Sequence, residues 1–370
     1  MSLWVVVGGQ FGSEGKGKIA AHIALREKID ICIRCGGPNS GHSINSGAET
    51  VVLRQLPTGY LNPKARLLIP AGALIDLAVL RHEIDVFKID PARIGVDRNA
   101  MIIEECDREK EQHLGLRERV SSTLSGVGAA ISRRVLRQND VLLAKEAGSN
   151  RPWLKALITN VSSELNSGLA AGKTALIEGT QGFGLSLYHS EFYPKCTSRD
   201  TTAAGFLSEV GVSPLAVTEI VMVFRTFPIR VHGIQAGPLK DEISWELLQR
   251  ESGYPMAIAE YTSVSKMLRR VARFDWELAK MAMAHNRPTR LAITGLDYLN
   301  YSDYNRRQTQ ALSEQSQKFI QRLEDLGPSK VHYWSSSPSL DAVFECKAVA
   351  GSTFTVATMP ANQHCWGSKC

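Results

Sequence analysis

Glycines and lysines near the N-terminus have the types and the spacing that bind phosphate. They form the run Gly8-Gly9-Gln10-Phe11-Gly12-Ser13-Glu14-Gly15-Lys16-Gly17-Lys18. Glycine lets the backbone bend sharply and approach a ligand closely, and the N-terminus of a following helix attracts negative charge. Lys16 and Lys18 add positive charges suited to phosphate oxygens. We therefore predict a phosphate-binding loop here, with a glycine-rich structural turn as the alternative.

This run departs from both standard nucleotide-binding loops. In the G-x-x-x-x-G-K-[ST] loop a magnesium-binding hydroxyl follows the lysine, but here Gly17 stands in that place. The glycine spacing also differs from the dinucleotide motif G-x-G-x-x-G. No acidic residue follows at the distance that a ribose requires, which argues against a dehydrogenase.

Further stretches combine polar residues with glycines in a way that could do chemistry. His42 lies in the glycine-rich stretch 36–43 and is a candidate for proton transfer, although taken alone it is better explained as a turn residue. Residues 121–128 carry hydroxyls and glycines, and Arg133, Arg134 and Arg137 follow. For these a phosphate site and a solvated basic helix are equally open. Residues 178–185 directly follow an apolar run, where ligands bind in parallel sheets.

Strands and helices must alternate along the chain to position these loops. Apolar residues at 3–7 predict a buried strand before the phosphate loop, and residues 18–25 a helix after it. We predict further strands at 31–34, 51–56, 66–69, 94–96, 174–177, 217–224, 290–294 and 330–334, and further helices at 76–87, 150–169, 276–285 and 308–326. No composition break divides the chain. The sequence therefore predicts an α/β fold, residues 1–370 forming a single large domain around a mainly parallel β-sheet with flanking helices.

Composition excludes several classes of protein. The 370 residues are 44% hydrophobic and 22% charged, which is ordinary for a globular chain. The net charge of +6 has no clustered basic run, so we expect small anionic substrates and no nucleic acid. No stretch is apolar enough to span a bilayer, and no secretory signal is visible, so we expect no membrane partner. Seven cysteines argue against a disulfide framework, and Cys32 and Cys35 are interpreted as buried thiols, so we expect a cytoplasmic protein (in the host cytoplasm if it is phage-encoded).

The motif G-x-x-G-x-E-G-K-G-K at residues 9–18 resembles the adenylosuccinate synthetase family, whose members join aspartate to C6 of a purine nucleotide. The stretches G-G-x-N-x-G-H-[ST] at 36–43, E-G-x-Q-G at 178–182 and Y-P-x-x-T-S-x-x-T-T-A-x-G at 193–205 also resemble this family. Residues 121–128, 262–270 and 335–338 match it weakly. The resemblance extends to about residue 340 and implies a P-loop-related fold, a homodimer and Mg2+ as cofactor.

The resemblance implies roles for individual residues. Catalytic roles fall on Ser13, Lys16, His42 and Gln181, with His42 polarising the 6-oxygen of the substrate. Contacts with the substrate nucleotide fall on Ser13, Asn39, Thr123, Arg137, Gln181, Leu185, Thr197 and Val231. Arg137 would act across the interface from the partner subunit, and Arg133 and Arg134 stay open as alternatives to it.

The resemblance also implies sites for aspartate, the nucleotide donor and the metal. Aspartate would contact Ser263, Ser265 and Arg269. The donor would contact Gly12, Gly15, Lys16, Gly17, Lys18, Gly41, His42, Ser43, Asp297, Ser335 and Ser337. Magnesium would meet Ser13 and the backbone carbonyl of Gly41. Two departures stand out, since Lys266-Met267 replaces a Gly-Arg pair and Gly295 replaces the lysine two residues before the base-reading aspartate.

Ser13 is the most informative departure, because the family normally carries an aspartate there that takes the N1 proton of inosine monophosphate (IMP). A serine hydroxyl is too weakly acidic to ionise and act as the base. A general base contributes roughly 10²–10⁴-fold to the reaction rate. The space that serine frees lies beside N1, where the 2-amino group of guanine projects, and a hydroxyl can accept a hydrogen bond from that group. A compact chain with serine in place of this aspartate resembles the phage branch of the family.

That branch makes 2-amino-2′-deoxy-N6-succinyladenylate, a precursor of 2-aminoadenine DNA, through a 6-phosphoryl intermediate. We therefore predict a ligase that takes dGMP, L-aspartate and ATP or dATP. The alternatives are ordinary adenylosuccinate synthesis from IMP, aspartate and GTP, and a nucleotide-binding protein without ligase activity.

Overall fold

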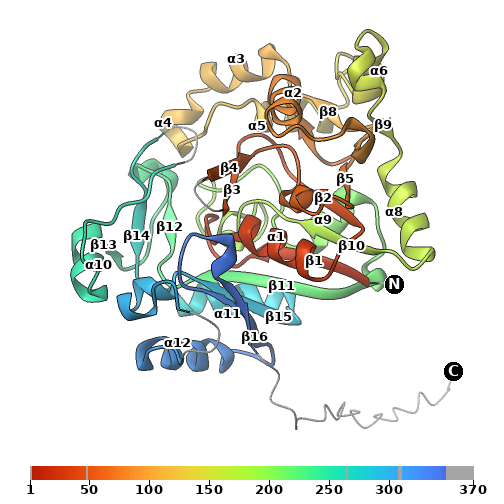
Figure 1. Cartoon of the computed structure of the whole chain (residues 1–370). Coiled ribbons are helices and arrows are strands. Elements are labelled where there is room, and N and C mark those ends of the chain that lie inside the picture. The colour runs from red at the N-terminus through yellow and green to blue at the C-terminus, as the bar shows by residue number, and fades with distance from the viewer. Residues whose placement is uncertain (1, 47–48, 263–265, 307–310, 347–370) are drawn as a thin grey trace, which may run out of the picture.

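Strand β1 (Ser2–Gly8), which precedes the phosphate loop, lies inside a ten-stranded sheet (Figure 1). The computed structural model describes residues 2–46, 49–262, 266–306 and 311–346. The strand order is β17-β16-β15-β11-β1-β10-β2-β5-β7-β9. All neighbouring pairs run parallel except β16 and β17. The predicted α/β fold with a mainly parallel sheet is confirmed.

The other strands of this sheet are β2 (Ile31–Arg34), β5 (Arg66–Ile69), β7 (Ile94–Asp97), β9 (Ile158–Thr159), β10 (Thr174–Glu178), β11 (Val217–Arg225), β15 (Arg290–Thr294), β16 (Lys330–Ser335) and β17 (Val343–Glu345). Strands β1, β10, β2, β11, β15 and β16 share one direction, so their carboxyl ends lie along the same edge. Ligands of open parallel sheets bind at that edge.

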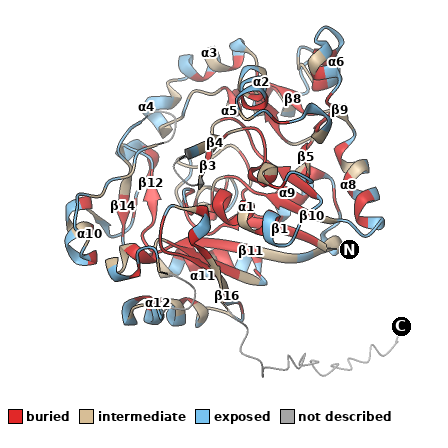
Figure 2. Ribbon diagram, viewed as in Figure 1, coloured by how far each residue is buried: buried red, intermediate tan, exposed pale blue. Residues whose placement is uncertain are grey.

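Helices cover both faces of the sheet, which explains why its central strands are apolar throughout. Leu3, Val5 and Val7 face one core, whereas Trp4 and Val6 face the other. The first core includes residues of α8 (Val161–Ala170), α9 (Ala203–Val210), α11 (Trp276–Asn286) and α12 (Glu314–Glu324). The second includes residues of α1 (Lys16–Arg26), α2 (Leu77–Val86), α6 (Ala144–Ser149) and α7 (Pro152–Lys155). Figure 2 shows the buried strands in red and the outer helix faces in pale blue.

Smaller sheets and further helices surround the ten-stranded sheet and the helices that cover it. Helices α3 (Glu105–His113), α4 (Leu116–Val120) and α5 (Val127–Val135) lie at the top of Figure 1. Helix α10 (Trp245–Ser252) lies at the left beside the sheet of β12 (Ile229–Arg230), β13 (Glu242–Ile243) and β14 (Arg270–Ala272). The remaining pairs are β3 (His42–Ser46) with β4 (Glu49–Leu53), and β6 (Leu74–Ile75) with β8 (Met101–Ile102). Within the described ranges no helix is long and apolar enough to cross a membrane.

Most predicted strands are present, but the single helix expected over 150–169 is wrong. That stretch folds as α7, β9 and α8, because the Asn160 side chain accepts a hydrogen bond from the Ser163 amide and starts a new helix. Similarly, Ser313 caps α12, so the helix expected from residue 308 begins at Glu314, and residues 308–310 lie outside the described part.

The stretch around His42 also differs from the expectation. The residue begins strand β3 instead of lying in a loop, and β3 pairs with β4, which ends at Leu53 rather than at residue 56. Cys32 and Cys35 are buried thiols, as predicted, and burial raises the pKa of both.

Candidate active site

The phosphate loop between β1 and α1 is shaped from the inside by a carboxylate. Gly12, Ser13 and Gly15 have φ angles of 86°, 60° and 86°, which turn the chain tightly. Glu14 is fully buried and accepts hydrogen bonds from the backbone amides of Gln10 (3.1 Å) and Gly12 (2.9 Å). Its other oxygen lies 2.5 Å from the Lys16 ammonium. Sequence reasoning missed this role of Glu14, although an acidic residue inside a phosphate loop was a usable signal.

The unusual Gly17 has a steric explanation. A Cβ atom at this position would lie 2.7 Å from the Cβ of His42 and 3.1 Å from the Cγ2 of Thr58. The first turn of α1 therefore packs directly against strand β3, and a side chain does not fit between them. The hydroxyl of the standard loop is excluded by the approach of His42 to the phosphate loop.

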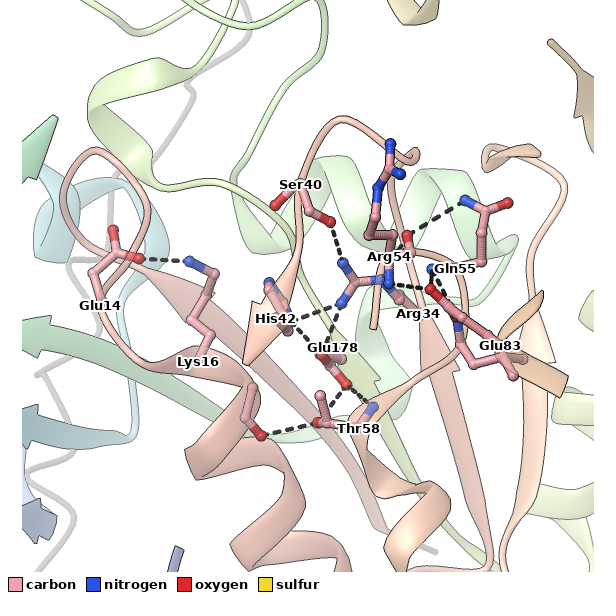
Figure 3. Close-up of polar contacts among 12 residues, drawn as sticks. Glu14, Lys16, Arg34, Ser40, His42, Arg54, Gln55, Thr58, Glu83 and Glu178 are labelled. Atoms are coloured by element: carbon pink, nitrogen blue, oxygen red, sulfur yellow. Dashed lines mark hydrogen bonds and ion pairs between the residues drawn. The ribbon is translucent and has the colours of Figure 1, made fainter. Parts of the chain in front are cut away.

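Glu178 binds His42 and Arg34 at the end of the sheet (Figure 3). Its Oε1 contacts Nδ1 of His42 and accepts a hydrogen bond from Arg34 at 2.9 Å. Its Oε2 accepts from the Thr58 amide at 2.7 Å. Glu178 ends β10, Arg34 ends β2 and His42 begins β3, so three strands contribute to one buried cluster. Sequence reasoning gave no role to Glu178 or Arg34.

These contacts decide the protonation of His42. Burial, together with the Arg34 cation, lowers the pKa of His42 to about 4. Burial alone would raise the pKa of Glu178, but His42, Arg34 and Thr58 bring it below its usual value. Nδ1 of His42 faces both Glu178, which only accepts hydrogen bonds, and Arg34 at 2.7 Å, which only donates them, so the two contacts favour opposite tautomers of the neutral ring. Among the described residues Nε2 finds no partner although it is buried, which marks it for contact with a ligand.

Two arginines converge on Ser13. The guanidinium of Arg269 donates to the Ser13 hydroxyl, and Arg225 donates to the Ser13 carbonyl at 3.0 Å. Glu260 holds Arg225 through an ion pair of 2.6 Å. Ser13 therefore lies at the exposed side of the phosphate loop next to positive charge. The other two predicted aspartate contacts, Ser263 and Ser265, lie outside the described residues.

The residues predicted for the nucleotide donor lie together beside α1. Lys18 donates to the Ser335 hydroxyl and the Ser337 carbonyl, both at 2.6 Å, and burial lowers its pKa to about 8. Asp297 is buried in the neighbouring turn η6 (Leu296–Tyr298), where burial raises its pKa to about 6. The hydroxyl of Tyr254, which sequence reasoning missed, donates to Asp297.

The other donor candidates flank these residues. Gly295 has a φ of 76°, a backbone conformation that suits glycine better than the lysine of the family. Gly41 is half-buried and Ser43 is exposed, on either side of His42.

The segments predicted to bind the substrate phosphate meet around the start of α5. A Cβ atom at Gly37 would lie 3.0 Å from Val127, which links the Asn39 loop to α5. A Cβ atom at Gly128 would lie 3.8 Å from Ser198, which follows Thr197. The hydroxyl of Ser121, two residues before Thr123, donates to the carbonyl of His232, which follows Val231, at 3.4 Å.

Leu185 and Gln181 connect this region to the phosphate loop. The Leu185 carbonyl accepts from the Thr197 amide at 2.8 Å. A Cβ atom at Gly12 would lie 3.9 Å from Oε1 of Gln181. The structure therefore places most predicted site residues around one edge of the sheet.

The structure separates the three arginines that the sequence left open. Arg133 is buried and pairs with Asp107 (2.8 Å) and Glu104 (2.9 Å), so it stabilises the fold. Arg134 donates to the Ala71 carbonyl at 2.9 Å. Arg137 is exposed, and its guanidinium has no partner within the described part of the chain. Of the three arginines, only Arg137 makes no side-chain hydrogen bond or ion pair with the described residues.

The site offers few ligands to a magnesium ion. No group of three acidic, histidine or cysteine side chains that could hold a metal occurs among the described residues. The hydroxyl of Ser13 accepts a hydrogen bond from a guanidinium, and Glu14 is already engaged with Lys16. A neutral carbonyl such as that of Gly41 fits Mg2+ only as a supplement to phosphate oxygens, a common arrangement for this ion.

Comparison with known proteins gives a consistent result. The sequence model of the adenylosuccinate synthetase family matches residues 5–145 and 139–306. The adenylosuccinate synthetase of Thermococcus onnurineus is 38% identical over 349 residues, covering 93% of this chain and 98% of that protein. The enzyme of Methanocaldococcus jannaschii is 39% identical over 349 residues, covering 93% and 96%.

Two solved structures have similar folds. The succinoaminodeoxyadenylate synthetase of cyanophage S-2L, bound to dGMP and to dATP as an energy donor, aligns with a TM-score of 0.78 at 26% identity and covers 93% of this chain and 95% of that one. The fully ligated adenylosuccinate synthetase of Plasmodium falciparum aligns with a TM-score of 0.78 at 20% identity, covering 94% and 100%, and supports the fold alone.

Proposed function

The chain belongs to the adenylosuccinate synthetase family and is a purine nucleotide–aspartate ligase, and from this premise we propose that its substrate is dGMP. In this proposal it joins L-aspartate to C6 of dGMP with hydrolysis of ATP or dATP, and the product is 2-amino-2′-deoxy-N6-succinyladenylate. The observation that carries the proposal is the serine at position 13. A relative of similar fold binds dGMP and dATP, which supports it.

The surroundings of Ser13 favour a guanine. A serine hydroxyl has two acceptor lone pairs, so it can accept from Arg269 and from the 2-amino group of guanine together. An aspartate here would carry a charge, and Arg269 would bind that charge as an ion pair. The neutral, smaller side chain leaves room for an amino group beside the phosphate loop.

His42 and the phosphate loop would carry out phosphoryl transfer. The amides of Gly15 and Gly17 and the ammonium of Lys16 would hold the triphosphate at the N-terminus of α1, whereas the amide of Gly12 is already bonded to Glu14. The 6-oxygen of the purine attacks the γ-phosphorus as N1 gives up its proton to solvent, and the nucleoside diphosphate leaves. With a proton on Nε2, His42 would donate a hydrogen bond to that oxygen. Arg34 and Glu178 fix its ring in this orientation.

The second step replaces the phosphoryl group by aspartate. The amine of aspartate attacks C6, the C6–O bond breaks, and phosphate leaves with that oxygen. Arg269, which lies at Ser13, would bind a carboxylate of aspartate, because a guanidinium pairs with a carboxylate through two parallel hydrogen bonds. Mg2+, which this family generally uses, would screen the charge of the triphosphate and would be held beside Gly41 by phosphate oxygens.

The proposal is tested by offering dGMP or IMP, each with ATP, dATP or GTP, together with aspartate and Mg2+. Phosphate release and the mass of the succinylated product are measured. We expect product from dGMP with ATP or dATP. The adenylosuccinate synthetase of Thermococcus onnurineus serves as a control for turnover of IMP. Turnover of IMP without turnover of dGMP would make this chain an ordinary adenylosuccinate synthetase, and no turnover of either would make it a nucleotide-binding protein.

A further inference from the structure

The hydroxyl of Tyr254 donates a hydrogen bond to the carboxylate of Asp297, the residue proposed to read the base of the donor. The tyrosine follows α10 after Gly253, whose left-handed backbone (φ 75°) turns the chain toward η6. There its hydroxyl donates to Oδ2 of Asp297. Asp297 is 3% exposed, so water competes little for this bond.

Neighbouring rings restrict the movement of Tyr254. Its ring centroid lies 4.6 Å from that of Tyr301, 5.8 Å from that of Tyr298 and 6.1 Å from that of Tyr304. Tyr298 is itself held, because its hydroxyl donates to Glu260 at 3.0 Å. The hydroxyl of Tyr254 also stays protonated, because burial and the adjacent Asp297 raise its pKa above the usual value. It is therefore a permanent donor to Asp297.

The two purine bases present different edges to a carboxylate. Guanine offers two adjacent donors, N1–H and the 2-amino group, and these pair with both oxygens of one carboxylate. Adenine offers one amino donor beside an acceptor nitrogen, so it requires only one oxygen. A bond that already occupies Oδ2 leaves a single oxygen of Asp297 for the base.

We propose that Tyr254 sets the donor specificity of this site, favouring adenine over guanine by occupying one oxygen of Asp297. The inference rests on the proposed function, in which Asp297 reads the base of the donor. A guanine bound here would keep one N–H group without a partner, which is unfavourable when the group is buried. An adenine would place its amino group on the free oxygen and has no second donor on that edge to leave unpaired.

The test is Tyr254→Phe, which removes the hydroxyl and keeps the ring in its aromatic surroundings. Tyr301→Phe is the matched control, since it also removes a hydroxyl from this cluster but not one that contacts Asp297. Values of kcat/KM for ATP and GTP are measured with the same purine monophosphate and aspartate. We expect Tyr254→Phe to raise the GTP/ATP ratio about 10-fold, equivalent to one lost hydrogen bond. Tyr301→Phe should leave the ratio within about 2-fold of the unmodified chain.

Binding measurements test the role of Tyr254 whether or not dGMP is the substrate. The affinities for the non-hydrolysable analogues of ATP and GTP are measured by calorimetry with the monophosphate site saturated. A chain that converts IMP, or converts nothing, refutes the dGMP proposal and still reports the ratio of the two affinities. The inference is overturned if the unmodified chain binds the guanine analogue better, or if both tyrosine variants change the ratio equally. It is also overturned if Asp297→Asn leaves both affinities unchanged, because Asp297 would then not contact the base.

Discussion

At the scale of single residues, Ser13 has the largest consequence for function. It lies where the polypeptide turns with positive φ, between Arg269 at its hydroxyl and Arg225 at its carbonyl. The two guanidiniums make this position electropositive, so a carboxylate placed there would be ionised and paired. The serine instead keeps a hydroxyl that can accept another hydrogen bond.

We predict that Ser13→Asp changes the choice of purine substrate. Aspartate tolerates positive φ, so the loop should keep its shape. The new carboxylate would pair with Arg269 and crowd the 2-amino group of guanine, so kcat/KM for dGMP should fall by about 10-fold or more relative to that for IMP. Steady-state kinetics on both substrates measure this ratio.

Ser13→Ala is the control for this prediction. It keeps the free space but removes the acceptor, so use of dGMP should fall without a gain for IMP. An equal effect of Ser13→Asp on both substrates would show that position 13 does not read the 2-amino group.

At the scale of secondary structure elements, the Glu178 cluster joins three strands and a turn. Glu178 on β10 binds Arg34 on β2, His42 on β3 and Thr58 in the turn η1 (Thr58–Leu61). The same cluster orients Nε2 of His42 beside the phosphate loop. The stability of the fold and the orientation of the His42 ring therefore both depend on the buried carboxylate of Glu178.

We predict that Glu178→Gln strongly destabilises the chain. The variant leaves the buried Arg34 cation uncompensated, which costs roughly 3–5 kcal/mol of unfolding free energy. Folding lowers the pKa of Glu178, so the unmodified chain loses stability as the pH falls through the carboxylate range. Urea unfolding at pH 7 and below pH 4.5, the ordinary pKa of a glutamate, measures both effects, and the variant should lose the part of the acid sensitivity that comes from Glu178.

The matched control is Glu242→Gln, which breaks the ion pair of Glu242 with Arg270. The carboxylate of Glu242 is 40% exposed, so the loss should stay below about 1 kcal/mol. Equal losses in the two variants would show that the Glu178 cluster does not stabilise the fold more than a surface pair does.

At the scale of the whole molecule, the surface around Arg137 has the properties of an interface. Val135 and Leu136, immediately before it, are 69% and 62% exposed. Apolar side chains of this size gathered on a surface commonly mark a contact with another chain. We therefore propose a homodimer in which Arg137 reaches the substrate phosphate of the partner subunit.

We predict that two inactive variants restore activity when mixed. Arg137→Ala removes the arginine given to the partner, and Lys16→Ala disables the phosphate loop of its own subunit. In a mixed dimer one site is complete, so random mixing should recover about a quarter of the unmodified activity. Phosphate release after subunits are exchanged measures this, and sedimentation reports the dimer.

Arg134→Ala mixed in the same way tests the alternative arginine. Complementation by Arg134→Ala and none by Arg137→Ala would reassign the role to Arg134. A monomer in sedimentation would refute the arrangement altogether.

The sequence by itself determined the local features of this protein. Runs such as residues 66–69 and 290–294 form strands where predicted, because apolar periodicity is a property of neighbouring residues. The glycine and lysine pattern at 8–18 likewise predicted the loop that joins β1 to α1. The helix expected over 150–169 failed for a local reason too, since the capping effect of Asn160 outweighed the apolar pattern.

Only the tertiary structure decided which of these features meet. Arg269 reaches Ser13, Tyr254 reaches Asp297, and Glu178 joins Arg34 to His42, although each pair is far apart in the sequence. The order of the strands in the sheet and the course of the loops at its edge create these contacts. No local pattern encodes that order, because it results from the packing of the whole chain around two cores.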